Sequence, residues 1–147
     1  MVSIVKRIGD ATKILQTIGY KAASISATEF RDYLTGETLT GDTITVSQIL
    51  ASDYFMIHEV AEMSELKARG IPLTKKTILE HVLETYEAHL IASEQEFTYA
   101  TRIGDYSWLK LRLRQAVCWF DDPHLPTKLC PLYKSLVKKY RQYLPSG

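Results

Sequence analysis

The segment TILEHVLETYEAHLIASEQEFTYATR, residues 77–102, contains neither Gly nor Pro and spaces its apolar side chains like one face of an α-helix. That apolar stripe is formed by Leu79, Leu83, Tyr86, Leu90 and Phe97. A second long helix is expected upstream, from Gln48 to about Arg69, with Ser47 as its N-cap and Gly70 as its terminator. A short connection between two long helices favours antiparallel packing.

Shorter helical patterns occupy the rest of the chain. They cover residues 2–18, residues 26–34, residues 105–120, and a last segment that begins at Thr127. The Thr- and Gly-rich stretch TGETLTGDTIT, residues 35–45, predicts a loop or a small hairpin. We therefore expect residues 1–147 to form a single all-α domain, an antiparallel bundle of five or six helices with the helices at 48–69, 77–102 and 105–120 at its centre.

The composition is that of a globular domain whose core needs no metal or disulfide. Hydrophobic residues make up 46% of the 147 residues, enough for a sizeable core in a chain of this length. Cys118 and Cys130 are too few and too far apart for a zinc ribbon or a disulfide scaffold. Any bound metal would therefore be functional or incidental.

Charge is distributed unevenly along the chain. Residues 1–99 contain nine Lys or Arg against fourteen Asp or Glu, whereas residues 100–147 contain nine against three. The basic C-terminal third predicts a solvated face or a contact with an acidic partner, and no RRM or KH signature points to nucleic acid. The chain has no signal-peptide h-region and no run of 18 apolar residues, so we expect a cytoplasmic protein that contacts no membrane.

Two segments are dense in metal-ligand side chains: MIHEVAEMSEL, residues 56–66, and ILEHVLETYEAHLIASEQEF, residues 78–97. His58 and Glu62 are four residues apart and His81 and Glu84 are three apart, spacings that place each pair on one helix face. Imidazoles with carboxylates suit Zn, Fe or Mn, and carboxylates alone suit Mg or Mn. The candidate metal ligands are His58, Glu59, Glu62, His81, Glu84 and Glu87.

The helical wheel leaves two interpretations of these ligands open. His58 and Glu62 point away from the main apolar face of their helix, as expected for solvated charge. However, Phe55 and Leu66 border the same surface and suggest that another element covers part of it, in which case a buried carboxylate needs a partner or a metal. The aromatic residues of the helices at 77–102 and 105–120, such as Trp119 and Tyr86, are interpreted as core, with an aromatic ligand pocket as the alternative.

Known ligand motifs discriminate among possible enzymes. Residues 58–62 read HExxE, not the HExxH of zincin proteases, and no Glu-x-x-His occurs for a ferritin-like centre. Residues 59–87 resemble the all-α nucleoside triphosphate pyrophosphatases, whose Glu-x-x-Glu and Glu-x-x-Asp helices hold Mg. Glu59 and Glu62 match the first half, and Glu84 and Glu87 stand in the second with Glu in place of Asp. This resemblance implies Mg-assisted hydrolysis of a triphosphate.

Two functional classes follow. The first is a metal-dependent hydrolase of a nucleotide or phosphorylated substrate, with Mg, Mn or Zn as cofactor and with Arg112 and Arg114 as candidate phosphate-binding residues. The second is a non-enzymatic helical interaction or scaffold protein that forms homo-oligomers or binds an acidic partner through its basic C-terminal third.

Overall fold

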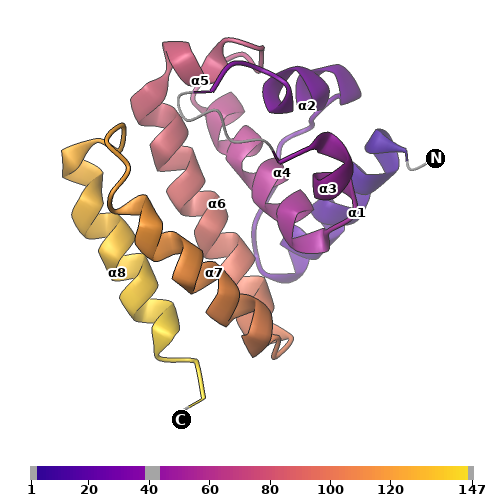
Figure 1. The fold of residues 1–147 in the computed structure, drawn as a ribbon. Coiled ribbons are helices and arrows are strands. Elements are labelled where there is room, and N and C mark those ends of the chain that lie inside the picture. Colours follow the sequence, from indigo (N-terminus) through magenta and orange to yellow (C-terminus); the bar gives the residue numbers. More distant parts are fainter. Residues whose placement is uncertain (1–2, 39–43, 146–147) are drawn as a thin grey trace.

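The fold is all-α. A computed structural model describes residues 3–38 and 44–145, and within these ranges it contains helices and no strand. The elements are α1 (Ile4–Thr17), α2 (Ala27–Leu34), α3 (Val46–Leu50), α4 (Asp53–Ala68), α5 (Thr77–Glu80), α6 (Val82–Arg102), α7 (Tyr106–Trp119), the 3-10 turn η1 (Thr127–Leu129) and α8 (Cys130–Arg141) (Figure 1). None of the helices in the described ranges is both long enough and apolar enough to span a bilayer.

Two of the helices expected from the sequence are each divided in two. Ser52 lies in extended backbone and its side chain accepts a hydrogen bond from the Phe55 backbone N–H, so it caps a new helix, α4, inside the segment 48–69. His81, with φ −133° and ψ 57°, separates α5 from α6 inside the segment 77–102. The spacing of apolar residues in the sequence did not reveal either break.

Several other helix ends follow the local sequence signals, although the last helix, α8, begins at Cys130 after the 3-10 turn η1 and not at Thr127. Ser26 and Glu29 form a capping box at the start of α2, each side chain bonding the other's backbone N–H. Gly70 and Gly104 adopt positive φ where α4 and α6 end, as their C-cap positions predict. The predicted loop at 35–45 lies partly outside the described residues. In its described part, the Glu37 N–H donates to the Lys75 carbonyl at 2.9 Å and joins the loop to the segment before α5.

Helix α6 runs between two groups of helices, with α7 and α8 on one side and α1 to α4 on the other (Figure 1). On one side the predicted stripe, including Leu83, Tyr86 and Leu90, packs against residues of α7, of α8 and of the segment that joins these two helices. On the other side Ala88 and Ala92, both fully buried, join the larger core with α4. Helix α6 is therefore buried on two faces.

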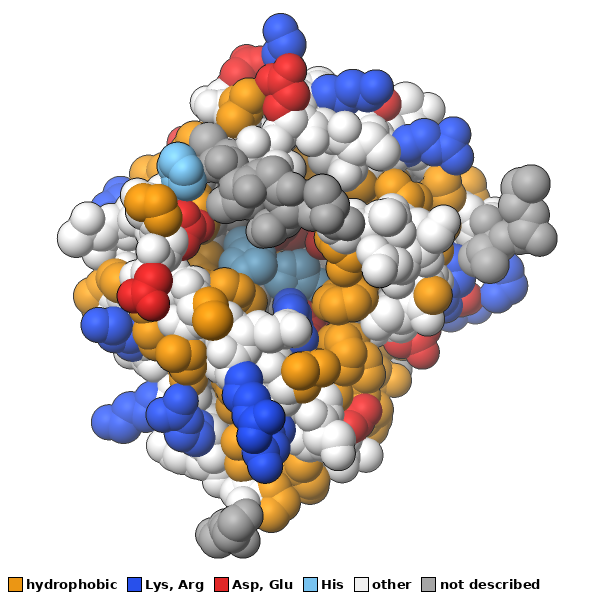
Figure 2. All heavy atoms as spheres, viewed as in Figure 1, with side chains coloured by type: hydrophobic (Ala, Val, Ile, Leu, Met, Phe, Trp, Pro, Cys, Tyr) orange, Lys and Arg blue, Asp and Glu red, His pale blue; other side chains and the backbone are white. Residues whose placement is uncertain are grey.

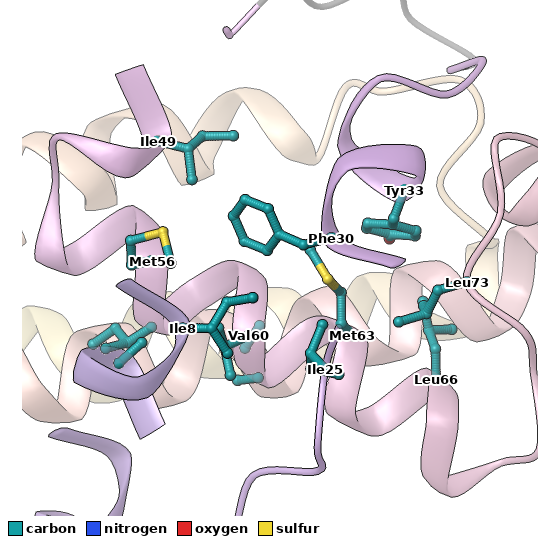
Figure 3. Packing of buried hydrophobic residues seen from close by; sticks show 14 of the residues in the cluster. Ile8, Ile25, Phe30, Tyr33, Ile49, Met56, Val60, Met63, Leu66 and Leu73 are labelled. Carbon is teal, nitrogen blue, oxygen red and sulfur yellow. The ribbon is translucent and has the colours of Figure 1, made fainter. Parts of the chain in front are cut away.

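Helix α4 is enclosed almost all round. Figure 3 shows Met56, Val60, Met63 and Leu66 of α4 packed among side chains of the N-terminal helices, including Ile8. The opposite side of α4 faces α6, so even polar positions of α4 are removed from water. The wheel-based expectation that His58 and Glu62 lie on a solvent face was therefore wrong; they are 4% and 7% exposed.

Candidate metal centre

Three side chains from α4 and α6 converge between these helices: His58, Glu62 and His89. Nε2 of His58 lies 3.2 Å from Nδ1 of His89, and that Nδ1 lies 3.2 Å from Oε1 of Glu62. The third separation, from His58 Nε2 to Glu62 Oε1, is 3.7 Å. No other trio of His, Cys, Asp or Glu in residues 3–38 and 44–145 brings its ligand atoms this close.

The helices create this cluster by simple spacing and close approach. His58 and Glu62 are separated by one turn of α4 and share a face, as their sequence spacing predicts. The side chains of Ala61, Ala88 and Ala92 are small and fully buried, and small side chains at a contact permit a short distance between helix axes. His89 of α6 can thus reach the polar face of α4.

Neighbouring buried side chains form hydrogen bonds to two members of the cluster, His58 and Glu62. Nδ1 of His58 pairs with Oε1 of Glu96 at 3.0 Å, and Glu96 is fully buried. The Tyr33 hydroxyl donates to Oε2 of Glu62 at 2.5 Å, leaving Oε1 of that carboxylate directed at His89. In metal sites the second nitrogen of a histidine ligand is commonly bonded to a carboxylate in this way, which fixes the ring and its tautomer.

Electrostatic coupling inside the cluster shifts the titration of its members. Burial alone would lower the pKa of His58, but its contacts with Glu62 and Glu96 raise it to about 10. Burial favours the neutral form of Glu62, yet the contacts with His58 and His89 lower its pKa below the ordinary value. Burial, the largest influence on His89, lowers its pKa. These shifts favour an ionised Glu62, a protonated His58 and a neutral His89 in the metal-free protein.

Arg112 supports the cluster from α7. Its Nε and Nη2 donate to Glu96 at 2.6 and 3.0 Å, and its guanidinium carbon lies 5.3 Å from the Phe55 ring centre and 5.8 Å from that of Trp119. The Trp108 indole N–H also donates to Glu96, at 2.8 Å. Arg112 was predicted as a phosphate-binding residue, and the structure places it in an ion pair behind His58. Arg114, the other candidate, is exposed on α7.

The remaining predicted ligands lie outside this trio. Glu87 pairs with Arg69 at 3.0 Å on the surface between α6 and α4. His81 and Glu84 are part-buried and lie outside the cluster. Glu59 is also part-buried; burial, followed by the negative charge of Glu62, raises its pKa to about 8. Of the six residues, the structure brings together His58 and Glu62.

His89 and Glu96 were not among the candidates that the sequence suggested. The signal that could have found them is the face of α6 that carries small residues. His89 and Glu96 are seven positions apart, two turns along that face, with Ala92 and Ser93 between them. Polar side chains that alternate with alanine and serine on a long helix mark a closely packed face with a polar centre.

A pocket of about 240 Å³ opens beside the cluster. Glu62 and His89 line it together with Trp119 and Tyr133, residues of α7 and α8. Figure 2 shows a hollow near the middle of this face, with histidine side chains at its floor and hydrophobic side chains around it. Two of the three side chains of the candidate centre, Glu62 and His89, therefore line this pocket.

Comparisons of the chain with models of protein families, with curated proteins and with solved structures gave no match.

Proposed function

We propose that this protein binds one divalent transition-metal ion, with Zn²⁺ as the best fit, through His58, Glu62 and His89, and uses the ion in a hydrolytic reaction. The observation that carries the proposal is the triangle of ligand atoms, with sides of 3.2, 3.2 and 3.7 Å. Ligands at zinc distances of 2.0–2.1 Å in a tetrahedron are about 3.3 Å apart, so an ion fits above this triangle with little rearrangement.

The donor set favours Zn²⁺ over the Mg²⁺ that the pyrophosphatase resemblance implies. Two imidazole nitrogens and one carboxylate oxygen are the atoms that zinc and neighbouring transition ions prefer. Mg²⁺ prefers oxygen ligands in an octahedron and keeps several waters. The Glu84 and Glu87 carboxylates that would complete an oxygen-rich site lie outside the trio.

Hydrolysis is the chemistry that such a site supports best. Three protein ligands with one open position characterise catalytic zinc sites, whereas structural sites use four. The pocket beside Glu62 and His89 supplies space for a water and a substrate at the open position. Zinc lowers the pKa of a bound water to about 7 and polarises a carbonyl or phosphoryl oxygen.

Metal binding is tested on untagged protein stripped with EDTA and titrated with Zn²⁺ and, separately, Mg²⁺. We expect one zinc per chain, and a gain in stability of about 2.7 kcal/mol when free zinc is a hundred times its Kd. His89→Ala should abolish zinc binding, and His124→Ala, which removes an exposed histidine outside the cluster, should not. Zinc-dependent hydrolysis of p-nitrophenyl acetate should follow the same pattern. Absence of zinc binding by the wild-type protein would overturn the proposal.

The basic surface supports a second candidate function, binding of an acidic partner. The exposed basic residues of α7, η1 and α8 are Lys110, Arg114, Lys128, Lys134, Lys138, Lys139 and Arg141. A surface of one sign attracts an oppositely charged partner and its binding weakens with salt. If this function holds, the double variant Lys138→Glu with Arg141→Glu should elute from heparin at clearly lower salt than the wild type. Equal elution would count against it.

A further inference from the structure

We infer that the pocket beside His89 binds a small molecule with an apolar body, about one aromatic ring in size, and a single polar head that reaches the metal position. This inference rests on the proposed function, because the head group is held by the ion. It replaces the nucleotide or phosphorylated substrate expected from the sequence.

The size and the walls of the pocket define the apolar body. A cavity of about 150 Å³ holds benzene, so about 240 Å³ holds a ring with a few further atoms. Aliphatic side chains from α5, from the start of α6 and from the segment before η1 form much of the wall; they are Ile78, Val82 and Leu125. Ligand pockets of this kind derive affinity from apolar contact and orientation from a few polar groups.

Aromatic rings surround the metal side of the pocket. The Trp119 ring meets the His89 ring edge to face, with centres 4.7 Å apart. The Tyr133 ring lies parallel to His89 at 6.1 Å and perpendicular to Trp119 at 6.0 Å. Rings arranged in this way offer faces and edges at which another aromatic ring packs favourably. The geometry therefore favours an aromatic body.

Polar side chains of the pocket are bonded within the protein. The Tyr86 hydroxyl donates to Oδ2 of Asp122 at 2.5 Å, and Oδ1 of Asp122 accepts from the His124 backbone N–H at 2.8 Å. The Tyr133 hydroxyl donates to the Tyr86 carbonyl, and that of Thr85 to the His81 carbonyl. The polar head of a ligand would therefore bind the proposed ion, which Glu62 and His89 would hold at the wall of the pocket.

The charge of the pocket opposes a polyphosphate. No Lys or Arg is among the described residues that line it, whereas two carboxylates, Glu62 and Asp122, are. Arg112, one of the two phosphate-binding residues expected from the sequence, is paired with Glu96 behind His58. Phosphate groups are normally held by Arg, Lys or clusters of backbone N–H groups. A single ion beside two carboxylates cannot neutralise three or four phosphate charges.

The test compares two ligands that share one metal-binding head. Zinc-loaded protein is titrated calorimetrically with benzohydroxamic acid, with acetohydroxamic acid, which carries a methyl group in place of the ring, and with pyrophosphate. We expect benzohydroxamic acid to bind at least tenfold more tightly than acetohydroxamic acid, and more tightly than pyrophosphate. Val82→Phe, which fills the pocket, should reduce the preference for the ring to about twofold while zinc remains bound. Leu111→Phe, at a position 46% exposed on α7, should leave the preference unchanged.

The outcomes separate this inference from the proposed function. If zinc is bound but the two hydroxamates bind equally, or neither binds, or pyrophosphate binds most tightly, the inferred ligand class is wrong and the metal site stands. If zinc itself is not bound, the proposed function fails and this inference falls with it. Should Val82→Phe fail to fold, the ratio of the two hydroxamates on wild-type protein still decides.

Discussion

Glu96 holds His58 from the side opposite to the ligand triangle, with Oε1 of the buried carboxylate 3.0 Å from Nδ1 of the ring. The carboxylate is itself fixed by Arg112 and Trp108. When His58 is neutral and its Nδ1 proton is donated to Glu96, the lone pair of Nε2 is directed toward His89 and Glu62. This one contact selects the tautomer that can bind a metal ion.

Glu96→Gln should therefore weaken zinc binding without removing a ligand. Loss of a carboxylate bonded to a histidine ligand typically costs 10–100-fold in metal affinity, and we expect a loss in that range. The guanidinium of Arg112 also loses its ion-pair partner, so the free energy of unfolding should fall by about 3 kcal/mol. Competition with a chelating dye measures the first effect and urea denaturation the second. The matched control is Glu94→Gln, at a position 45% exposed on the same helix; equal losses in the two variants would contradict the assignment.

Tyr33→Phe should remove the hydrogen bond that orients the Glu62 carboxylate. The Tyr33 hydroxyl donates to Oε2 of Glu62 in a buried setting, and a hydrogen bond to a charged group contributes about 1.5–3 kcal/mol. We expect that loss in the free energy of unfolding of the metal-free protein, together with weaker zinc binding because the carboxylate is less well oriented. Tyr143→Phe, at an exposed position, should change neither quantity. Unchanged zinc affinity in Tyr33→Phe would show that the hydroxyl does not position the ligand.

The stability of the metal-free protein should decline between pH 6.5 and pH 10. The folded pKa of His58, about 10, lies above its ordinary value, so its contribution is complete below pH 6.5 and is lost as the pH rises toward 10. Glu59, with a folded pKa raised to about 8, acts in the same direction over the lower part of this range. Urea denaturation at pH 6.5 and pH 9.5 should differ by about 2–4 kcal/mol. If zinc displaces the proton of His58 as proposed, the decline should be smaller in zinc-loaded protein; a flat profile without zinc would refute the pairing of His58 with the two carboxylates.

Gly36→Ala should destabilise the fold through a backbone collision. An ideal Cβ at Gly36 lies 2.5 Å from the Lys75 carbonyl oxygen, and neither backbone can yield without disturbing the bond from Glu37 to Lys75. We expect a loss of about 1–3 kcal/mol. Gly9→Ala, in α1, where the new Cβ would have no atom within 4 Å beyond its chain neighbours and its own helix backbone, should instead stabilise the protein by about 0.5–1 kcal/mol. Thermal or urea denaturation of the two variants measures whether Gly36→Ala lowers and Gly9→Ala raises the free energy of unfolding.

The helices could be predicted from local sequence signals, whereas the candidate site depends on how the helices pack together. The cap at Ser26 and the positive φ at Gly70 follow from the residues themselves. The burial of His58 and Glu62 does not, because a helical wheel compares faces of one helix and cannot show that α4 is covered on every side. His89 was not among the predicted ligands, because its partner Glu62 lies 27 positions away in sequence and only the pairing of α4 with α6 joins them.

The placement of Arg112 on α7, behind a ring carried by α4, also has a consequence for biosynthesis. More than fifty residues separate His58 from Arg112, whose guanidinium binds Glu96, the carboxylate partner of His58. A growing chain therefore exposes His58 and Glu62, the first two proposed ligands, well before Arg112 is synthesised. If the chain binds zinc as proposed, we expect the ion to be acquired after α7 has docked, so that a translation product truncated before residue 105 would retain less zinc than the full chain.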